Sequence, residues 1–121
     1  GQHRDTFNIK AAMQPVVDYA RIYALRHRIE ETNTFERLDQ LLAQKKISIQ
    51  EHSELDTAYS YLMQQRFVTQ VKTVIAENSE PDNYVNPKQL SRIEQTMLKE
   101  IFKRIEKFQA KLSFDFIGQK F

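Results

Sequence analysis

The sequence predicts an all-α fold, an antiparallel helical bundle of about four main helices with a long central helix. Two observations support this prediction. Apolar residues recur at helical rather than alternating spacing along the chain. At three places Ser or Asn is followed three residues later by Glu, a pattern typical of helix starts. The length of 121 residues, 40% of them hydrophobic, suits a single domain with its own core.

The first two helices are expected in the first third of the chain. One helix is predicted over residues 14–29, with Pro15 in its first turn, where a missing N–H costs nothing. One face of this helix carries Val16, Ala20, Tyr23, Ala24 and His27. Asn33 then caps a second helix, Glu36 completes the capping box, and a short apolar stripe ends near Lys45.

The third helix is expected to be long. Ser48 and Glu51 repeat the capping box and open a segment without a helix breaker until Asn78. Its apolar residues fall on two faces, with Leu55, Ala58, Tyr59 and Leu62 on one side and Phe67, Val68, Val71, Val74 and Ile75 on nearly the opposite side. A helix that changes its buried face in this way is expected to run through the centre of the bundle.

A loop and a last helix complete the predicted fold. Residues 78–90 contain two prolines and three asparagines, so they are expected to form the one substantial loop. Ser91 and Glu94 form a third capping box. The helix that follows carries a stripe of Ile93, Met97, Ile101, Ile105, Phe108, Leu112 and Phe116, with Lys and Glu opposite.

The composition argues against several classes of function. The only glycines are Gly1 and Gly118, so phosphate-cradling loops, dinucleotide-binding turns and nucleophile elbows are not expected. There is no cysteine, and the three histidines are scattered, so no metal site is expected. Eighteen basic and sixteen acidic residues are interleaved, which does not suit a nucleic-acid-binding protein.

The hydropathy and the first residues of the chain suggest its location in the cell and its domain organisation. No apolar run approaches the length of a membrane span, so we expect a cytoplasmic protein that does not bind membranes. The chain opens with Gly1 and a polar stretch. We therefore expect residues 1–8 to be a linker and residues 1–121 to be one helical domain cut from a longer protein.

Polar residues on the long helix suggest a binding site. The face that begins with Leu55 continues into Arg66 and Gln70, which then either face solvent or line a polar cleft. Arginines from the first two helices could join Arg66 around an anionic group, because a guanidinium binds phosphate or carboxylate through two hydrogen bonds. The candidate substrate-binding residues are Arg21, Arg37, Arg66, Gln70, Asn83 and Tyr84. No catalytic residue and no metal ligand is expected.

Each candidate also has an ordinary structural interpretation. Arg37 could pair with a neighbouring carboxylate, and Asn83 and Tyr84 are common in turns and loops. A separate hypothesis rests on Arg21 and His27, because their Arg-x5-His spacing occurs in some helical nucleases, where the histidine would transfer a proton.

Four stretches together resemble a known family, the putative nucleotidyltransferase substrate-binding domain. In order over nearly the whole chain they are Asn8-Ile9-Lys10 with Pro15 and Ala20-Arg21, Glu31-Thr32-Asn33-Thr34-Phe35-Glu36-Arg37-Leu38, Arg66 with Gln70, and Glu80-Pro81-Asp82-Asn83-Tyr84-Val85-Asn86-Pro87 with Leu90-Ser91. The Asn-Thr-x-Glu-Arg-Leu and Pro-Asp-Asn-Tyr elements are the more specific ones.

The resemblance implies a place in a larger signalling protein. In this family the domain follows a nucleotidyltransferase-like domain similar to the bacterial enzymes that uridylylate the PII signal protein or adenylylate glutamine synthetase. Cyclic-nucleotide-binding and cystathionine β-synthase domains often lie upstream. The expected partners are therefore the catalytic and regulatory domains of the same polypeptide and a protein acceptor, with neither nucleic acid nor membrane.

The resemblance also implies which part of the reaction this chain serves. The catalytic part of such enzymes resembles a Gly-Ser turn with an Asp-x-Asp pair that holds magnesium and the nucleotide, and this sequence has neither. Mg²⁺ and a nucleoside triphosphate are thus expected in an upstream domain, and no cofactor is expected in this chain. The expected function is an accessory acceptor-binding domain that is not catalytic alone. The alternatives are a structural or protein-interaction bundle and a helical ribonuclease-like domain that uses Arg21 and His27.

Overall fold

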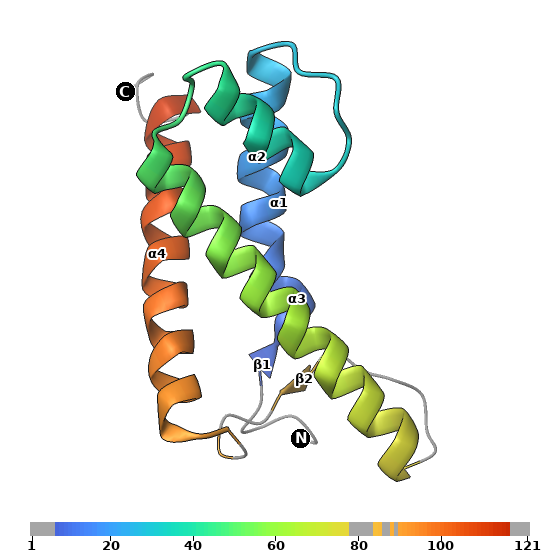
Figure 1. The fold of residues 1–121 in the computed structure, drawn as a ribbon. Helices are drawn as coiled ribbons and strands as arrows, with labels where there is room; N and C mark the ends of the chain where they lie inside the picture. The colour runs from blue at the N-terminus through green and yellow to red at the C-terminus, as the bar shows by residue number, and fades with distance from the viewer. Residues whose placement is uncertain (1–6, 78–83, 86–87, 89, 117–121) are drawn as a thin grey trace.

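A computed structural model describes residues 7–77, 84–85, 88 and 90–116. Four helices pack against each other, and a pair of two-residue strands lies at one end (Figure 1). The elements are β1 (Phe7–Asn8), α1 (Ile9–Arg26), α2 (Thr34–Ala43), α3 (Ile49–Glu77), β2 (Tyr84–Val85) and α4 (Arg92–Phe116). The predicted all-α fold class is confirmed. None of the helices, as far as the chain is described, is long and apolar enough to span a membrane.

Helix α1 begins earlier than the sequence analysis predicted. The side chain of Asn8 caps it by accepting a hydrogen bond from the Ala11 amide at 3.1 Å. Pro15 therefore lies inside the helix and not in its first turn, so that prediction was wrong. An interior proline costs about 3 kcal/mol, because it leaves a backbone carbonyl without a partner. Burial of Ile9 and Met13 in the additional turns offsets this cost.

Helices α1 and α2 end in the same motif, although neither end has a glycine. The Ile29 amide donates to the Ala24 carbonyl, and the Lys46 amide donates to the Leu41 carbonyl, each at 2.8 Å. This six-to-one hydrogen bond requires a left-handed residue just before its donor, a position that favours glycine. Here Arg28 and Lys45 adopt φ values of 58° and 60°. Each left-handed non-glycine residue costs about 1 kcal/mol.

The core lies where α1 meets the other three helices. The predicted face of α1 is buried at Val16, Ala20, Tyr23 and Ala24. The Tyr19 ring, also buried, lies 4.6 Å from the Tyr23 ring and 5.3 Å from the Phe108 ring of α4, measured between centroids. Across the described residues, the Tyr19 hydroxyl has no hydrogen-bond partner.

Helix α3 is the long helix that was predicted, but only its first half is buried as expected. Leu55, Ala58 and Leu62 lie in the core. The second apolar face is not buried, so that part of the prediction was wrong: Phe67 and Ile75 are 67% and 78% exposed. Figure 1 gives the physical reason, because the second half of α3 diverges from α4 and extends past α2.

Helix α4 starts at the predicted capping box. The Glu94 amide donates to the Ser91 hydroxyl at 3.1 Å, and the Ser91 amide donates to the Glu94 carboxylate at 3.0 Å. The middle of the predicted stripe is buried in the core, as Ile101, Ile105 and Phe108. Its first residues, Ile93 and Met97, are exposed, because α3 and α4 diverge at this end.

The strand pair joins two distant parts of the chain. Phe7 pairs with Val85, and Asn8 pairs with Tyr84, in antiparallel register. The pair links the start of α1 to the segment between α3 and α4 (Figure 1). Most of the loop predicted over residues 78–90 lies outside the described residues.

Candidate functional site

The arginines predicted to bind an anion lie on three different helices. Arg21 is exposed on α1, where it pairs with Asp18 at 3.3 Å. The Arg37 guanidinium donates to the Glu31 carbonyl at 2.8 Å, so it holds the α1–α2 connection. Arg66 is half-buried in the second half of α3. These contacts of Arg21 and Arg37 are local, and the gathering of the three arginines around one anion stays a prediction.

The remaining candidates are placed only in part. Gln70 lies one turn after Arg66 on α3 and is half-buried. Tyr84 contributes its backbone to β2, and Asn83 lies outside the described residues. For the ribonuclease hypothesis, Arg21 and His27 lie on or next to α1 but six residues apart. Six residues correspond to about 120° around a helix and about 9 Å along it, so the two side chains do not share a face.

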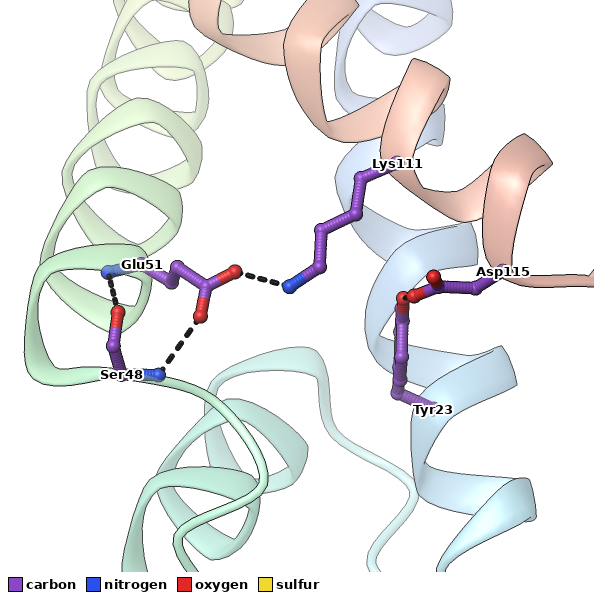
Figure 2. Close-up of polar contacts among 5 residues, drawn as sticks. All are labelled: Tyr23, Ser48, Glu51, Lys111 and Asp115. Carbon is purple, nitrogen blue, oxygen red and sulfur yellow. Dashed lines mark hydrogen bonds and ion pairs between the residues drawn. The ribbon is translucent and has the colours of Figure 1, made fainter.

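A polar cluster between α3 and α4 stands out in the structure. Figure 2 shows the capping box of α3, in which the Glu51 amide donates to the Ser48 hydroxyl at 3.0 Å and the Ser48 amide donates to the Glu51 carboxylate at 2.9 Å. Lys111 of α4 reaches across and forms an ion pair with Glu51. Nearby, the Tyr23 hydroxyl of α1 donates to the Asp115 carboxylate of α4. Half-buried polar groups from three helices are thus paired here.

A second ion pair continues this cluster along α3. Glu54 pairs with Arg104 of α4 and accepts a hydrogen bond from the Gln50 side chain at 3.1 Å. From the sequence, the lysines and glutamates of α4 were expected on the side opposite the core stripe of that helix. The two ion pairs were not predicted, because the capping-box pattern at Ser48 and Glu51 does not indicate a partner on another helix. The repeat of Arg104, Lys107 and Lys111 at helical spacing is the signal that could have suggested one.

Two adjoining pockets form a groove between α3 and α4. The first, of about 400 Å³, is lined by Ser48, Gln50, Glu51, Glu54, Lys107, Phe108 and Lys111. The second, of about 430 Å³, shares Glu54 and is lined further by Ser53, Thr57, Ala58, Thr96, Met97, Glu100, Ile101 and Arg104. We call the two together the α3–α4 groove. One end is rich in charged groups, and the other contains the apolar side chains of Ala58, Met97 and Ile101.

The two glutamates of the groove that pair with α4 have lowered pKa values. Burial alone would raise the pKa of Glu51, but the hydrogen bonds from Lys111 and Ser48 outweigh it and lower that pKa. Hydrogen bonding from Gln50, together with Arg104, lowers the pKa of Glu54. Burial raises the pKa of Tyr23 well above its usual value, and its bond to Asp115 adds to this rise. Carboxylates that stay ionised suit binding better than proton transfer at neutral pH, and Tyr23, which does not line the groove, stays neutral.

The comparisons with known proteins identify a family. The model of one family, described as "Putative nucleotidyltransferase substrate binding domain", matches residues 1–116. Among curated proteins and among solved structures, no significant match was found. Within the part of the chain that the structure describes, no group of three or more His, Cys, Asp or Glu side chains is placed to hold a metal ion. Since the match covers nearly the whole chain, the protein belongs to the family described as "Putative nucleotidyltransferase substrate binding domain".

Proposed function

We propose that this chain is the accessory acceptor-binding domain of a nucleotidyltransferase-type signalling protein and does not transfer nucleotides alone. Family membership supports the first part. The sequence supports the second, because it lacks a Gly-Ser turn followed by Asp-x-Asp. Nucleotidyl transfer needs carboxylates that hold Mg²⁺ against the transferred phosphate. Mg²⁺ and a nucleoside triphosphate therefore bind in a preceding nucleotidyltransferase-like domain of the same polypeptide.

The α3–α4 groove is the surface that receives the acceptor in this proposal. The observation that carries it is the contrast between the two ends of one groove. At one end the ammonium groups of Lys107 and Lys111 lie beside the carboxylates of Glu51 and Glu54, whereas Met97 and Ile101 provide apolar surface at the other end. An acceptor protein segment with a polar side chain that hydrogen-bonds to charged groups of either sign, and with an apolar side chain, would match both ends.

The absence of catalysis by the chain alone is directly testable. The isolated chain and the longer protein with its preceding domain are each incubated with labelled nucleoside triphosphates, Mg²⁺ and cell-extract proteins as acceptors. We expect label on protein only with the longer form. Reproducible labelling by the isolated chain would overturn the accessory role.

The groove is tested with two matched variants of the longer protein. Met97→Glu places a carboxylate at the apolar end of the groove, whereas Ile93→Glu places one a turn earlier on α4, outside the residues that line it. Both side chains are exposed, so neither variant should unfold the domain. We expect Met97→Glu to lower labelling of the acceptor about tenfold or more, with Ile93→Glu close to wild type. Equal activity of the two variants would exclude the groove as the acceptor site.

A second candidate, a protein-interaction bundle, is favoured by one observation. Phe67, Val74 and Ile75 form an exposed apolar face on the second half of α3. Such a face is typical of a contact with another protein or domain. If Phe67→Ser abolished assembly with the rest of the polypeptide while Met97→Glu left acceptor labelling intact, this interaction role would replace the acceptor-binding one.

A further inference from the structure

The end of the bundle where α1 and α2 terminate carries a group of basic side chains. It consists of Arg26, His27, Arg28, Lys45 and Lys46, which we call the basic end surface. The arginines and lysines are exposed, and His27 is half-buried. The two helices that carry these residues pack against each other, and both end at the top of the molecule in Figure 1.

These cations interact across two elements of the fold. Burial lowers the pKa of His27, and the positive charges of Lys46 and Arg26 lower it further. Lys46 follows α2, whereas Arg26 is the last residue of α1. Lys46 and Arg26 thus both act on the His27 imidazole, and a bound anionic group would be attracted by positive charges from both helices.

The backbone at this surface holds two of its basic residues in an unusual conformation. Arg28 and Lys45 hold the two left-handed positions that glycine would occupy at lower cost. Attraction between cations and a helix C-terminus does not require this placement. A basic residue in the last turn provides it without strain, as Arg26 does in α1. Arg28 and Lys45 lie two residues beyond α1 and α2, where they add two exposed positive charges to the basic end surface.

A hollow beside the lysines adds apolar surface. It has a volume of about 680 Å³ and is lined by Leu42, Lys45, Lys46, Ile47, Ser48 and Ile49. Ile49 is 78% exposed at its rim. The occupant that fits is one with acidic groups and an apolar side chain. A concave surface receives a protein side chain, whereas a flat bilayer would contact protruding groups only.

We propose that the basic end surface is a docking site for an acidic segment of a partner protein, which inserts an apolar side chain into the hollow beside Ile49. This surface is separate from the α3–α4 groove. Its occupation follows from charge complementarity, and binding weakens as salt screens the surface charges.

The test uses the full chain and a fluorescent synthetic peptide of Asp and Glu residues that carries a single Leu. Binding is followed by fluorescence anisotropy at several salt concentrations. The double variant Arg28→Gly with Lys45→Gly should bind about tenfold more weakly, because two surface charges are lost. The same variant should melt at a higher temperature, because glycine relieves the left-handed strain. Lys99→Gln with Lys103→Gln, which removes two exposed charges from α4, serves as the matched control and should bind normally.

Several outcomes would overturn the proposal. If a peptide with Asn and Gln in place of Asp and Glu bound as tightly as the acidic peptide, an acidic partner would be excluded. Binding of anionic phospholipid vesicles without binding of the peptide would make this a lipid surface instead. If the double glycine variant bound the acidic peptide with unchanged affinity, Arg28 and Lys45 would not be part of the binding site. Met97→Glu should leave peptide binding intact, so failure of the groove proposal is distinguishable from failure of this one.

Discussion

Two buried tyrosines on adjacent turns of α1 offer a matched pair of substitutions with opposite expected effects. Tyr19→Phe removes a hydroxyl that has no hydrogen-bond partner among the described residues. An unpaired buried hydroxyl costs about 1–3 kcal/mol, so this variant should raise the free energy of unfolding by about 1 kcal/mol. For a domain of this size, that gain corresponds to a rise in Tm of about 4 °C.

The neighbouring substitution should destabilise the fold. Tyr23→Phe removes the donor of the hydrogen bond to the Asp115 carboxylate. Hydrogen bonds to charged groups contribute about 1.5–3 kcal/mol, so the free energy of unfolding should fall by that amount. Each variant removes only the hydroxyl group of its own ring, and the two ring centroids lie 4.6 Å apart. Differences in ring packing therefore contribute little to the difference in stability between the two variants.

Urea unfolding followed by circular dichroism at pH 7 measures both effects. Burial raises the pKa of each phenol above its usual value, so both tyrosines are neutral at this pH. The double variant checks additivity, because side chains in contact can be coupled. If Tyr19→Phe lost as much stability as Tyr23→Phe, the Tyr19 hydroxyl would be hydrogen-bonded in solution, and the reasoning would be wrong.

Four further predictions address the ion pair, a cap and the second half of α3. Because the pKa of Glu51 is lowered in the folded state, its ionisation stabilises the fold above its unfolded pKa, and this contribution is lost as pH falls through the folded pKa. Lys111→Met should therefore cost about 0.5–1 kcal/mol at pH 7 and flatten the acid limb of stability, as urea titrations at several pH values would reveal. Ser91→Ala removes the cap of α4 and should cost about 1 kcal/mol in the same assay. Phe67→Ser should change the free energy of unfolding by less than about 0.5 kcal/mol. A larger loss would mean that the apolar face on the second half of α3 is covered in solution. Arg66→Met in the longer protein tests the anion site predicted from the sequence, because Arg66 does not line the α3–α4 groove. Lower acceptor labelling with little change in Tm would support that site, whereas unfolding of the variant would assign Arg66 a structural role.

Local signals explain how much of the fold could be predicted. The capping boxes at Ser48 and Ser91 form as expected, since a cap depends on residues three positions apart. The apolar stripe of α1 is buried from Val16 to Ala24, whereas His27 lies just beyond the helix and is half-buried. The stripe also continues back to Ile9 through Met13. The prediction stopped short because Pro15 indicated a helix start. Periodicity across the proline would have corrected it.

What could not be predicted depends on contacts between distant parts of the chain. The apolar residues Phe67 and Ile75 have helical spacing whether or not another element covers them, so periodicity alone cannot distinguish a core face from an exposed one. The pairing of Glu51 with Lys111 could not be predicted for a similar reason, because each residue has an ordinary role within its own helix. The sequence identified polar residues as candidates on α3 but could not say which polar residues of α4 would lie opposite them.

The strand pair has a consequence for the order in which parts of the fold unfold locally. Its partners lie more than seventy residues apart, so closing it costs on the order of 4 kcal/mol of chain entropy, and two residues per strand repay little of that. The pair can persist only while α1 and α3 are already docked. Amide hydrogens at Phe7 and Asn8 should therefore exchange together with those at Tyr84 and Val85, and well before those of the buried α1 segment around Tyr19. β1 and β2 would then behave as one cooperative unit, which unfolds without unfolding the helices around the core.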